Sequence, residues 1–555
     1  MRKWWRVMLK NKSIPIGIDN FKELIENNYC YVDKTDLIED IFIRGAKVNL
    51  FPRPRRFGKT LTISMLDNYF NIKKKEENKE LFKCLKIESN SSKVKEAQGK
   101  YPIISLNLKS VKDVSWEKEL TLLKNNLSTL YKQNTEVKSV LDEDELSEYV
   151  SIEKKVATND SYQLALKKLS QYLMRYYKQP VIILIDEYDA PIENGFINGF
   201  YDDVINFMRN FLGEALKTNE NLKFACLTGI LRVSKESIFS GLNNIRIYSI
   251  LDKQYSEYFG FLPQEVDRLL AEYGIENKEE VKNWYDGYKF AGTEIYNPWS
   301  ILNVLDSKKI QPYWVNTGGT TLLENMLKTA NPSVKRDLED LIEGKIVECA
   351  LNENIVYSEI NGSRENIINF LLMCGYLTVE ESWLHIDTIM GKLRIPNVEV
   401  SVAFKTIVKR WFEENNARDE ILDFQKAILK NDKELAEIIL NQLMLKSISY
   451  FDNVENFYHG FVLGLLVDMG NAYIVESNKE SGYGRYDMKI EKKDGTLGII
   501  LEFKTVQEEK QMEEMAEKAL EQIEEKEYYI DMKKRGVTKI YKYGIAFNNK
   551  KVMMK

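Results

Sequence analysis

The sequence predicts an α/β protein of 555 residues with two separate sheets, a larger parallel one followed by a smaller one. Short apolar runs alternate with longer helical patterns up to about residue 250, which is typical of a parallel sheet covered on both faces. The pattern turns mostly helical from 251 to 440, and new strand-like runs follow from about 445. The chain is too long for one hydrophobic core, so we expect domains at 13–250, 251–440 and 445–555.

Four buried strands are predicted in the first region, because these runs are apolar and rich in β-branched residues. They are Ala46–Phe51, Pro102–Leu108, Val181–Ile185 and Leu222–Thr228. Helical patterns such as Tyr162–Tyr177 and Asp203–Thr218 lie between them. Residues 71–100 are rich in Lys and Glu, which predicts solvated helices or an exposed insertion. We interpret 251–440 as a helical extension of the first domain with a linking region.

Composition narrows the classes of function. Hydrophobic residues make up 44% and charged residues 29%, as in ordinary globular proteins, and the net charge of −5 gives no overall basic field. Two histidines and five scattered cysteines argue against histidine-rich or zinc sites, so a catalytic metal would be held mainly by carboxylates, as Mg²⁺ or Mn²⁺ is. We find no signal peptide and no membrane span, and we expect a cytoplasmic protein.

A phosphate-binding loop, or Walker A motif, is predicted directly after the first strand. Residues 53–60 read Arg-Pro-Arg-Arg-Phe-Gly-Lys-Thr and lead into a helical pattern. Backbone N–H groups and the helix N-terminus favour phosphate oxygens, Lys59 would reach the β- and γ-phosphates of ATP, and the Thr60 hydroxyl would ligate Mg²⁺. Arg53 replaces the usual first glycine. The nucleotide contacts expected from this loop are Arg53, Arg56, Gly58, Lys59 and Thr60.

Two carboxylates end the apolar strand that begins at Val181, as in a Walker B motif. Asp186 would hold the Mg²⁺ directly or through water, and Glu187 would orient and activate the attacking water. A buried strand followed by a polar turn would explain the apolar run, but not its occurrence together with the glycine-lysine-threonine loop. The strand Pro102–Leu108, together with the adjacent Glu187, favours the ATPase branch in which a further strand lies between the two motif strands.

Two polar residues follow the strand Leu222–Thr228 or end it. Thr228 would sense the γ-phosphate of the nucleotide. Arg232 would either contact that phosphate or form a salt bridge at the surface, and the sequence favours neither.

Several segments resemble the bacterial AAA-ATPase-like family. They are Ile14–Gly17, Tyr31–Thr35, Arg53–Thr60 and Asp186–Asp189, with Tyr296–Ser300 similar to a further recurrent segment of the family. The likeness spans most of the chain, and the arginine-rich loop is the usual form in this family. It implies a P-loop NTPase sheet with a helical extension, ATP binding, and often a C-terminal domain of the PD-(D/E)xK nuclease superfamily.

A second constellation lies near the C-terminus, where Asp487 precedes Glu502 and Lys504 on two strand-like runs, Tyr486–Ile490 and Leu497–Phe503. Glu502 and Lys504 share a face, because alternate residues of a strand point the same way. Asp487 reaches the same edge if the two strands pair as a hairpin. The carboxylates would bind one or two Mg²⁺ ions that activate water against a phosphodiester. Lys504 would position that water or stabilise the developing negative charge.

Flanking helices complete the set. Glu455 begins the helical pattern Asn453–Met469 and would supply a third carboxylate to the metal, and Gln522 on the charged helix Gln511–Tyr529 would face the site. We interpret His459 as a helix-packing residue. In order and type the set resembles the PD-(D/E)xK superfamily, which implies catalytic roles for Glu502, Lys504 and Gln522. Further strands are expected at Ala472–Glu476 and Ile540–Phe547, which gives a smaller α/β domain.

We therefore expect a bacterial ATP-binding protein with a Mg²⁺- or Mn²⁺-dependent nuclease domain acting on nucleic acid, DNA before RNA, with a homo-oligomer as an open expectation. One alternative is an ATP-driven switch or scaffold whose nuclease fold binds nucleic acid without cleaving it. Another is that the loop holds no nucleotide and the N-terminal half only assembles subunits. Stabilisation of the fold by ATP would separate this last hypothesis from the others.

Overall fold

The structure is a computed structural model of the chain. It describes residues 12–217, 219–232, 244–314, 332–342, 344–353, 357, 363–404, 418–447, 455–466, 469, 472–482, 484–549 and 551–555. The chain forms two compact units: an N-terminal unit of residues 1–317 and 348–400, and a C-terminal unit of residues 318–347 and 401–555. Both units therefore share the middle range 251–440 that we had predicted as one region.

The N-terminal unit is built on a five-stranded parallel sheet with strand order β2-β3-β4-β1-β5. All four strands predicted from the sequence are confirmed, and a short fifth one completes the sheet. The strands are β1 (Val48–Pro52), β2 (Ile103–Asn107), β3 (Val181–Asp186), β4 (Leu222–Gly229) and β5 (Ile245–Ile247). β4 lies between the two motif strands β1 and β3, whereas β2 forms an edge, so our assignment of the intervening strand to Pro102–Leu108 was wrong.

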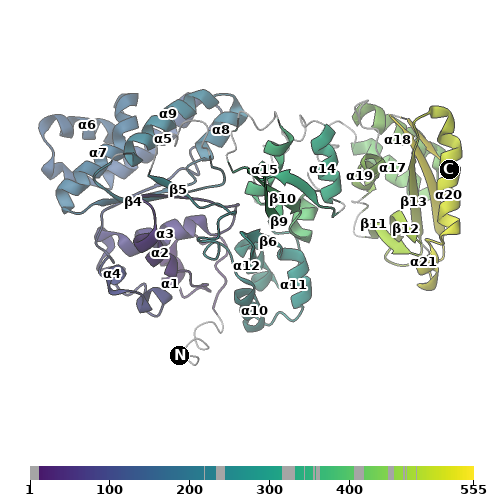
Figure 1. The fold of residues 1–555 in the computed structure, drawn as a ribbon, viewed down its shortest axis with the longest axis horizontal. Helices are drawn as coiled ribbons and strands as arrows, with labels where there is room; N and C mark the ends of the chain where they lie inside the picture. The colour runs from purple at the N-terminus through teal and green to yellow at the C-terminus, as the bar shows by residue number, and fades with distance from the viewer. Residues whose placement is uncertain are drawn as a thin grey trace. The chain divides into compact units, whose positions relative to one another are not determined.

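Helices cover both faces of this sheet, as the alternating pattern predicts (Figure 1). One group comprises α1 (Phe21–Glu26), α2 (Asp36–Arg44), α3 (Lys59–Phe70) and α4 (Ser92–Lys95). The other comprises α5 (Trp116–Lys132), α6 (Glu143–Glu153), α7 (Asn159–Tyr177), α8 (Ala190–Asn198) and α9 (Tyr201–Leu216). Residues 71–100 form turns and short helices, α4 among them, that bury Phe82, Ile87 and Val94, so this segment packs onto the unit and is not an exposed insertion.

The rest of the N-terminal unit is mixed. Its helices are α10 (Pro263–Glu272), α11 (Lys278–Tyr285), α12 (Pro298–Ser307) and α15 (Arg364–Cys374). Two small sheets accompany them: a hairpin of β6 (Tyr288–Phe290) with β7 (Thr293–Ile295), and a sheet in which β10 (Thr388–Arg394) lies between β8 (Val347–Ala350) and β9 (Thr378–His385). The sequence did not indicate these strands, because they are short or largely exposed and carry no apolar run.

The family segment Tyr296–Ser300 is the start of α12. The Asn297 side chain accepts hydrogen bonds from the backbone N–H groups of Trp299 and Ser300, at 2.9 and 3.4 Å, and Pro298 occupies the first helical position. Asparagine as an N-cap and proline immediately after it are both preferred at helix starts, since they satisfy or remove unpaired N–H groups. This motif therefore fixes where α12 begins.

The C-terminal unit contains a second sheet, with strand order β11-β12-β13-β14-β15. The strands are β11 (Tyr473–Ser481), β12 (Gly484–Lys492), β13 (Gly498–Thr505), β14 (Ile540–Asn548) and β15 (Lys551–Met554). β13 and β14 pair in parallel, and the other neighbours are antiparallel. In Figure 1, α17 (Arg418–Lys430), α18 (Lys433–Ser447) and α19 (Glu455–Leu466) lie on one side of this sheet and α20 (Met512–Glu525) on the other. Helices α14 (Pro332–Ile342) and α21 (Ile530–Lys534) complete the described part of this unit.

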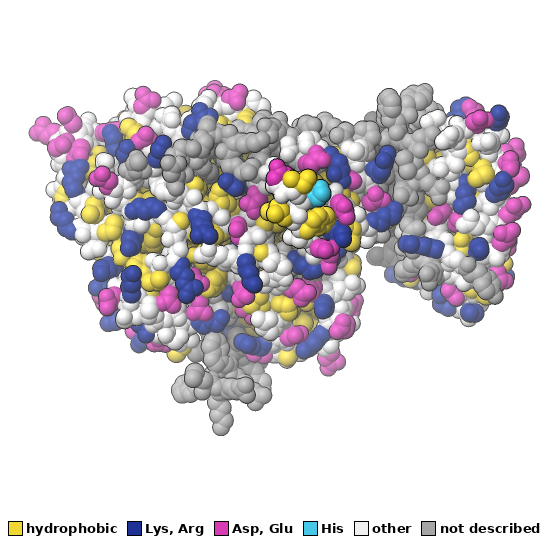
Figure 2. Space-filling model, viewed as in Figure 1, with side chains coloured by type: hydrophobic (Ala, Val, Ile, Leu, Met, Phe, Trp, Pro, Cys, Tyr) yellow, Lys and Arg dark blue, Asp and Glu magenta, His cyan; other side chains and the backbone are white. Residues whose placement is uncertain are grey.

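Basic and acidic side chains are intermixed over the face of the N-terminal unit shown in Figure 2, in keeping with the small net charge. Within the described ranges, no helix is both long enough and apolar enough to cross a membrane.

Candidate functional site

The predicted phosphate loop joins β1 to α3 in a conformation that requires glycine at its end. Gly58 caps α3 with φ 82°, and Arg56 also has a positive φ, of 70°. A Cβ atom at Gly58 would meet nothing within 4 Å, so the backbone conformation, rather than a lack of space, favours glycine there. The free N–H groups at the start of α3 lie at this turn, where they can bind phosphate oxygens.

Lys59 lies inside the loop that it belongs to. Its Nζ donates to the carbonyl oxygens of Arg53 and Pro54, each at 3.0 Å, and the side chain is buried. Burial lowers the pKa of Lys59, and the charges of Glu187, Asp189 and Asp186 oppose that shift. A phosphate group that entered the loop would offer this cation stronger acceptors than the two carbonyls.

Asp186 is the point at which several strand ends converge. The buried carboxylate, at the end of β3, accepts hydrogen bonds from Thr60 Oγ1 at 2.7 Å, from Asn107 Nδ2 at 3.0 Å and from Thr228 Oγ1. Three predicted residues, Thr60, Asp186 and Thr228, are thus brought together. A hydroxyl and a carboxylate oxygen in contact are ligands that suit Mg²⁺, so the residues present fit that ion. Asn107, which pairs with Asp186 across β2 and β3, was not predicted from the sequence.

Glu187 follows Asp186 in a left-handed conformation, with φ 51°. The turn that contains it is tied to the end of β4. Tyr188 donates to Leu231 O at 2.7 Å, and the Asp189 carboxylate accepts from the N–H groups of Ile230 and Leu231 at 2.7 and 2.9 Å. Burial raises the pKa of Asp189 to about 6. These bonds hold Glu187 in a strained conformation next to Asp186, and strain of this kind is usually found at functional sites.

The structure corrects the role expected for the Arg53 side chain. Its guanidinium is fully buried, donates to Pro52 O at 2.9 Å and to Tyr248 O, and lies over the rings of Phe259 and Phe290 at 5.0 and 5.4 Å. Burial lowers the pKa of Arg53 to about 9. The side chain therefore packs the base of the loop, and we do not assign it a contact with nucleotide.

The other arginines have different surroundings. Arg56 is exposed, with its guanidinium carbon 4.3 Å from the centroid of the Trp299 ring. The Arg55 side chain pairs with Glu193 at 3.0 Å. The Arg232 guanidinium lies 3.8 Å from the Glu353 carboxylate. Of the two possibilities for Arg232, a phosphate contact or a salt bridge, the structure contains the salt bridge. Arg56 thus stays at the mouth of the loop, where a ligand can reach it.

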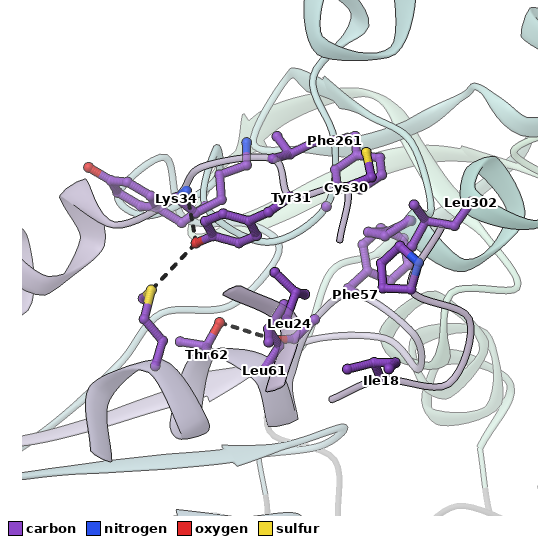
Figure 3. Close-up of a pocket in the computed structure, with 17 residues that line it drawn as sticks. Ile18, Leu24, Cys30, Tyr31, Lys34, Phe57, Leu61, Thr62, Phe261 and Leu302 are labelled. Atoms are coloured by element: carbon purple, nitrogen blue, oxygen red, sulfur yellow. Dashed lines mark hydrogen bonds between the residues drawn. The ribbon is translucent and has the colours of Figure 1, made fainter. Parts of the chain in front are cut away.

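An apolar pocket of about 100 Å³ lies beside the loop (Figure 3). Four of the family segments meet there, because Pro15, Tyr31 and Pro298 all line it together with Phe57 and Gly58 of the loop. The Tyr31 hydroxyl accepts from the backbone N–H of Lys34 at 3.3 Å and contacts Met65 Sδ at 3.7 Å. Apolar walls next to a phosphate loop suit the base of a nucleotide.

In the C-terminal unit, four of the residues predicted for the nuclease site lie together: Asp487, Glu502, Lys504 and Gln522. β12 and β13 pair antiparallel next to Asp487 and Glu502, so that Asp487 N donates to Glu502 Oε2 at 3.4 Å and Phe503 N donates to Asp487 Oδ2 at 2.7 Å. Lys504 Nζ lies 3.3 Å from Glu502 Oε1, which also accepts from Gln522 Nε2 of α20. The hairpin expected from the sequence is confirmed.

The electrostatics of this cluster favour a bound cation. Glu502 is only 2% exposed, and burial, followed by repulsion from Asp487, raises its pKa to about 7, although Lys504 acts in the opposite direction. Two carboxylates held together in a poorly solvated site would be stabilised by a divalent ion, so the residues present fit Mg²⁺ or Mn²⁺. Among the described residues no group of three or more Asp, Glu, His or Cys converges. Glu455 begins α19, but its side chain and that of His459 lie outside the described residues.

Sequence reasoning also missed Tyr528. Its hydroxyl accepts from Gln522 Nε2 at 3.0 Å, so it adjoins the site through the glutamine. A tyrosine six residues beyond Gln522 was the available signal, and by itself it looks like an ordinary core residue.

Two family models match the chain. The model for predicted AAA-ATPases matches residues 15–239, and that for the PD-(D/E)XK nuclease superfamily matches residues 453–555. The chain is also 25% identical over 400 residues, which are 71% of this chain and 69% of the relative, to a protein of Azotobacter chroococcum mcd 1 described as "Uncharacterized protein in vnfD 5'region". The first matched region contains β1 to β4 and the phosphate loop, and the second contains all five strands of the second sheet. The chain thus joins an AAA-ATPase-like domain to a C-terminal domain of the PD-(D/E)XK nuclease superfamily.

Proposed function

We propose that this protein binds and hydrolyses ATP in its N-terminal unit and cleaves nucleic acid phosphodiesters, DNA before RNA, in its C-terminal unit. The observation that carries the nuclease proposal is the convergence of Asp487 of β12 and Glu502 and Lys504 of β13 with Gln522 of α20. Burial of charged groups together in this way destabilises the folded state, so such clusters usually occur where a ligand binds.

In the ATP site, each residue has a separate task. Lys59 would exchange its two carbonyl partners for phosphate oxygens, and the base would enter the apolar pocket beside Phe57. Thr60 and Asp186 would hold Mg²⁺, with Thr228 fixing the orientation of the Asp186 carboxylate. Glu187 would accept a proton from the attacking water, since it follows Asp186 directly and its side chain is not buried.

In the nuclease site, Asp487 and Glu502 would hold Mg²⁺ or Mn²⁺, with Glu455 as a further proposed ligand. When bound, the ion supplies a Lewis acid that activates water and offsets charge on the leaving oxygen. Gln522 donates to Glu502 and so orients its carboxylate. Lys504 would leave Glu502 to orient the water and stabilise the negative charge that develops on the phosphate.

A cleavage assay tests this proposal. Single- and double-stranded DNA and RNA are incubated with the full chain in Mg²⁺ or Mn²⁺, and Glu502→Gln is compared with Glu521→Gln, which changes an exposed carboxylate on α20. We expect the wild type and Glu521→Gln to cleave DNA and Glu502→Gln to be inactive. Binding of nucleic acid without cleavage by the wild type would instead support the switch or scaffold alternative.

ATP binding is tested separately by thermal unfolding. A ligand at 100 times its dissociation constant stabilises the folded state by about 2.7 kcal/mol, which is a measurable rise in unfolding temperature. We expect ATP with Mg²⁺ to stabilise the wild type but not Lys59→Ala. If ATP with Mg²⁺ stabilised Lys59→Ala as much as the wild type, or stabilised neither protein, the loop would hold no nucleotide.

A further inference from the structure

Gly482, which follows β11, and Gly484, which begins β12, lie close to the junction between α20 and α21. Gly482 has φ 61°, and a Cβ there would overlap the carbonyl oxygens of Lys526 and Glu527. A Cβ at Gly484 would lie 3.2 Å from Tyr528 Cε1 and 3.3 Å from the Tyr528 hydroxyl oxygen. Two glycines therefore allow this turn to approach the helix junction and the tyrosine.

A buried serine ties the same two segments together. Ser481 Oγ lies 2.9 Å from Tyr528 O and 3.0 Å from the Asp531 carboxylate. The Tyr528 ring is 2% exposed and packs with Tyr486, Ile523 and other core side chains on this side of the sheet. The position of the Tyr528 hydroxyl is thus fixed by the turn, by the junction and by the core.

The Tyr528 hydroxyl contacts the side-chain amide of Gln522, which in turn contacts the Glu502 carboxylate. Gln522 Nε2 donates both to Glu502 Oε1 and to the Tyr528 hydroxyl, the latter at 3.0 Å. An amide nitrogen carries two hydrogens, so each acceptor can receive one. With both bonds made, the amide has one orientation, and its carbonyl oxygen cannot turn toward Glu502.

We propose that Tyr528 is a positioning residue for Glu502, acting through Gln522, and that the turn at Gly482 and Gly484 holds the tyrosine in place. The inference deepens the proposed function and rests on the metal-binding role of Glu502. Loss of the Tyr528 hydroxyl frees the Gln522 amide to rotate and leaves Glu502 less well oriented. Changes to such outer-shell partners typically weaken metal binding about 10- to 100-fold.

The test is a double-mutant cycle on Mn²⁺ affinity, measured by electron paramagnetic resonance or calorimetry on the full, nucleotide-free chain. The binding that disappears in Glu502→Gln is assigned to the C-terminal site. We expect Tyr528→Phe to weaken this binding about tenfold in the wild type and to have no further effect in Gln522→Ala. Tyr529→Phe is the matched control, because it removes a neighbouring hydroxyl and should leave Mn²⁺ affinity unchanged.

Each outcome decides the inference. Equal losses from Tyr528→Phe with and without Gln522 would show that the tyrosine acts by packing alone and would overturn it, as would unchanged affinity in Tyr528→Phe. A positive cycle in a protein that cleaves nothing would uphold the inference while refuting the nuclease proposal. Absence of Glu502-dependent Mn²⁺ binding in the wild type would overturn both.

Discussion

Glu502→Gln is predicted to stabilise the C-terminal unit at alkaline pH in the absence of metal. Glu502 has an ordinary carboxyl pKa of 4.5 when unfolded and a pKa raised to about 7 by burial and by Asp487 when folded. At about 1.4 kcal/mol per pKa step, ionised Glu502 destabilises the folded unit by something on the order of 3 kcal/mol. Glutamine keeps an oxygen acceptor for Gln522 and Lys504 but carries no charge.

The sign of the pH dependence follows from proton binding. Between pH 4.5 and about 7 the folded state holds a proton at Glu502 that the unfolded state has lost, so stability falls as pH rises through this range. Below pH 4.5 the side chain is neutral in both states, and the substitution gains little. We therefore expect a stabilisation of roughly 1–3 kcal/mol at pH 8 and almost none at pH 4.

Hydrogen exchange of the β13 amides measures this difference, because these buried strand amides exchange only when much of the unit opens. Wild type and Glu502→Gln are compared at the same pH, with a chelator present, and Glu521→Gln is the control. Equal protection in wild type and Glu502→Gln at pH 8, or a gain of the same size at pH 4, would show that the charge of Glu502 does not destabilise the folded unit.

Three further predictions concern the N-terminal unit. Lys59→Ala should lose the stabilisation by ATP of about 2.7 kcal/mol at 100 times the dissociation constant, measured by thermal unfolding. Arg53→Met should lower the free energy of unfolding by roughly 3 kcal/mol, measured in urea, because it leaves buried carbonyls such as that of Tyr248 without a donor. Thr228→Val should slow ATP hydrolysis about tenfold or more with little change in ATP affinity, because it frees the Asp186 carboxylate. Steady-state kinetics would show an unchanged rate of hydrolysis if Thr228 only packs.

The elements that the sequence predicted best are those with a strong local pattern. β3 is an unbroken apolar run that ends in Asp186, and both its burial and the position of the carboxylate follow from that pattern. Glu502 and Lys504 were predicted to share a face because alternation in a strand is a local rule. Gln522 was also predicted to lie on the helix that follows the strand of Glu502 and Lys504, and it lies on α20.

Other features depend on contacts between distant residues. The position of β4 between β1 and β3 is set by the packing of the whole sheet, which no short segment encodes. The burial of Arg53 could not be foreseen, because its partners, Tyr248 and Phe259, come from a later part of the chain. The apolar pocket of Figure 3 has the same origin, because its walls come from segments that lie far apart in the sequence.

Both proposed activities are tested together by cleavage of DNA in Mg²⁺ with and without ATP, using the wild type, Lys59→Ala and Glu502→Gln in parallel. We expect that the wild type cleaves, that Glu502→Gln does not, and that ATP changes the rate for the wild type but not for Lys59→Ala. Cleavage that persists in Glu502→Gln, or no cleavage of any substrate by the wild type, would contradict the proposed nuclease. A response to ATP that survives in Lys59→Ala would contradict the proposed nucleotide site.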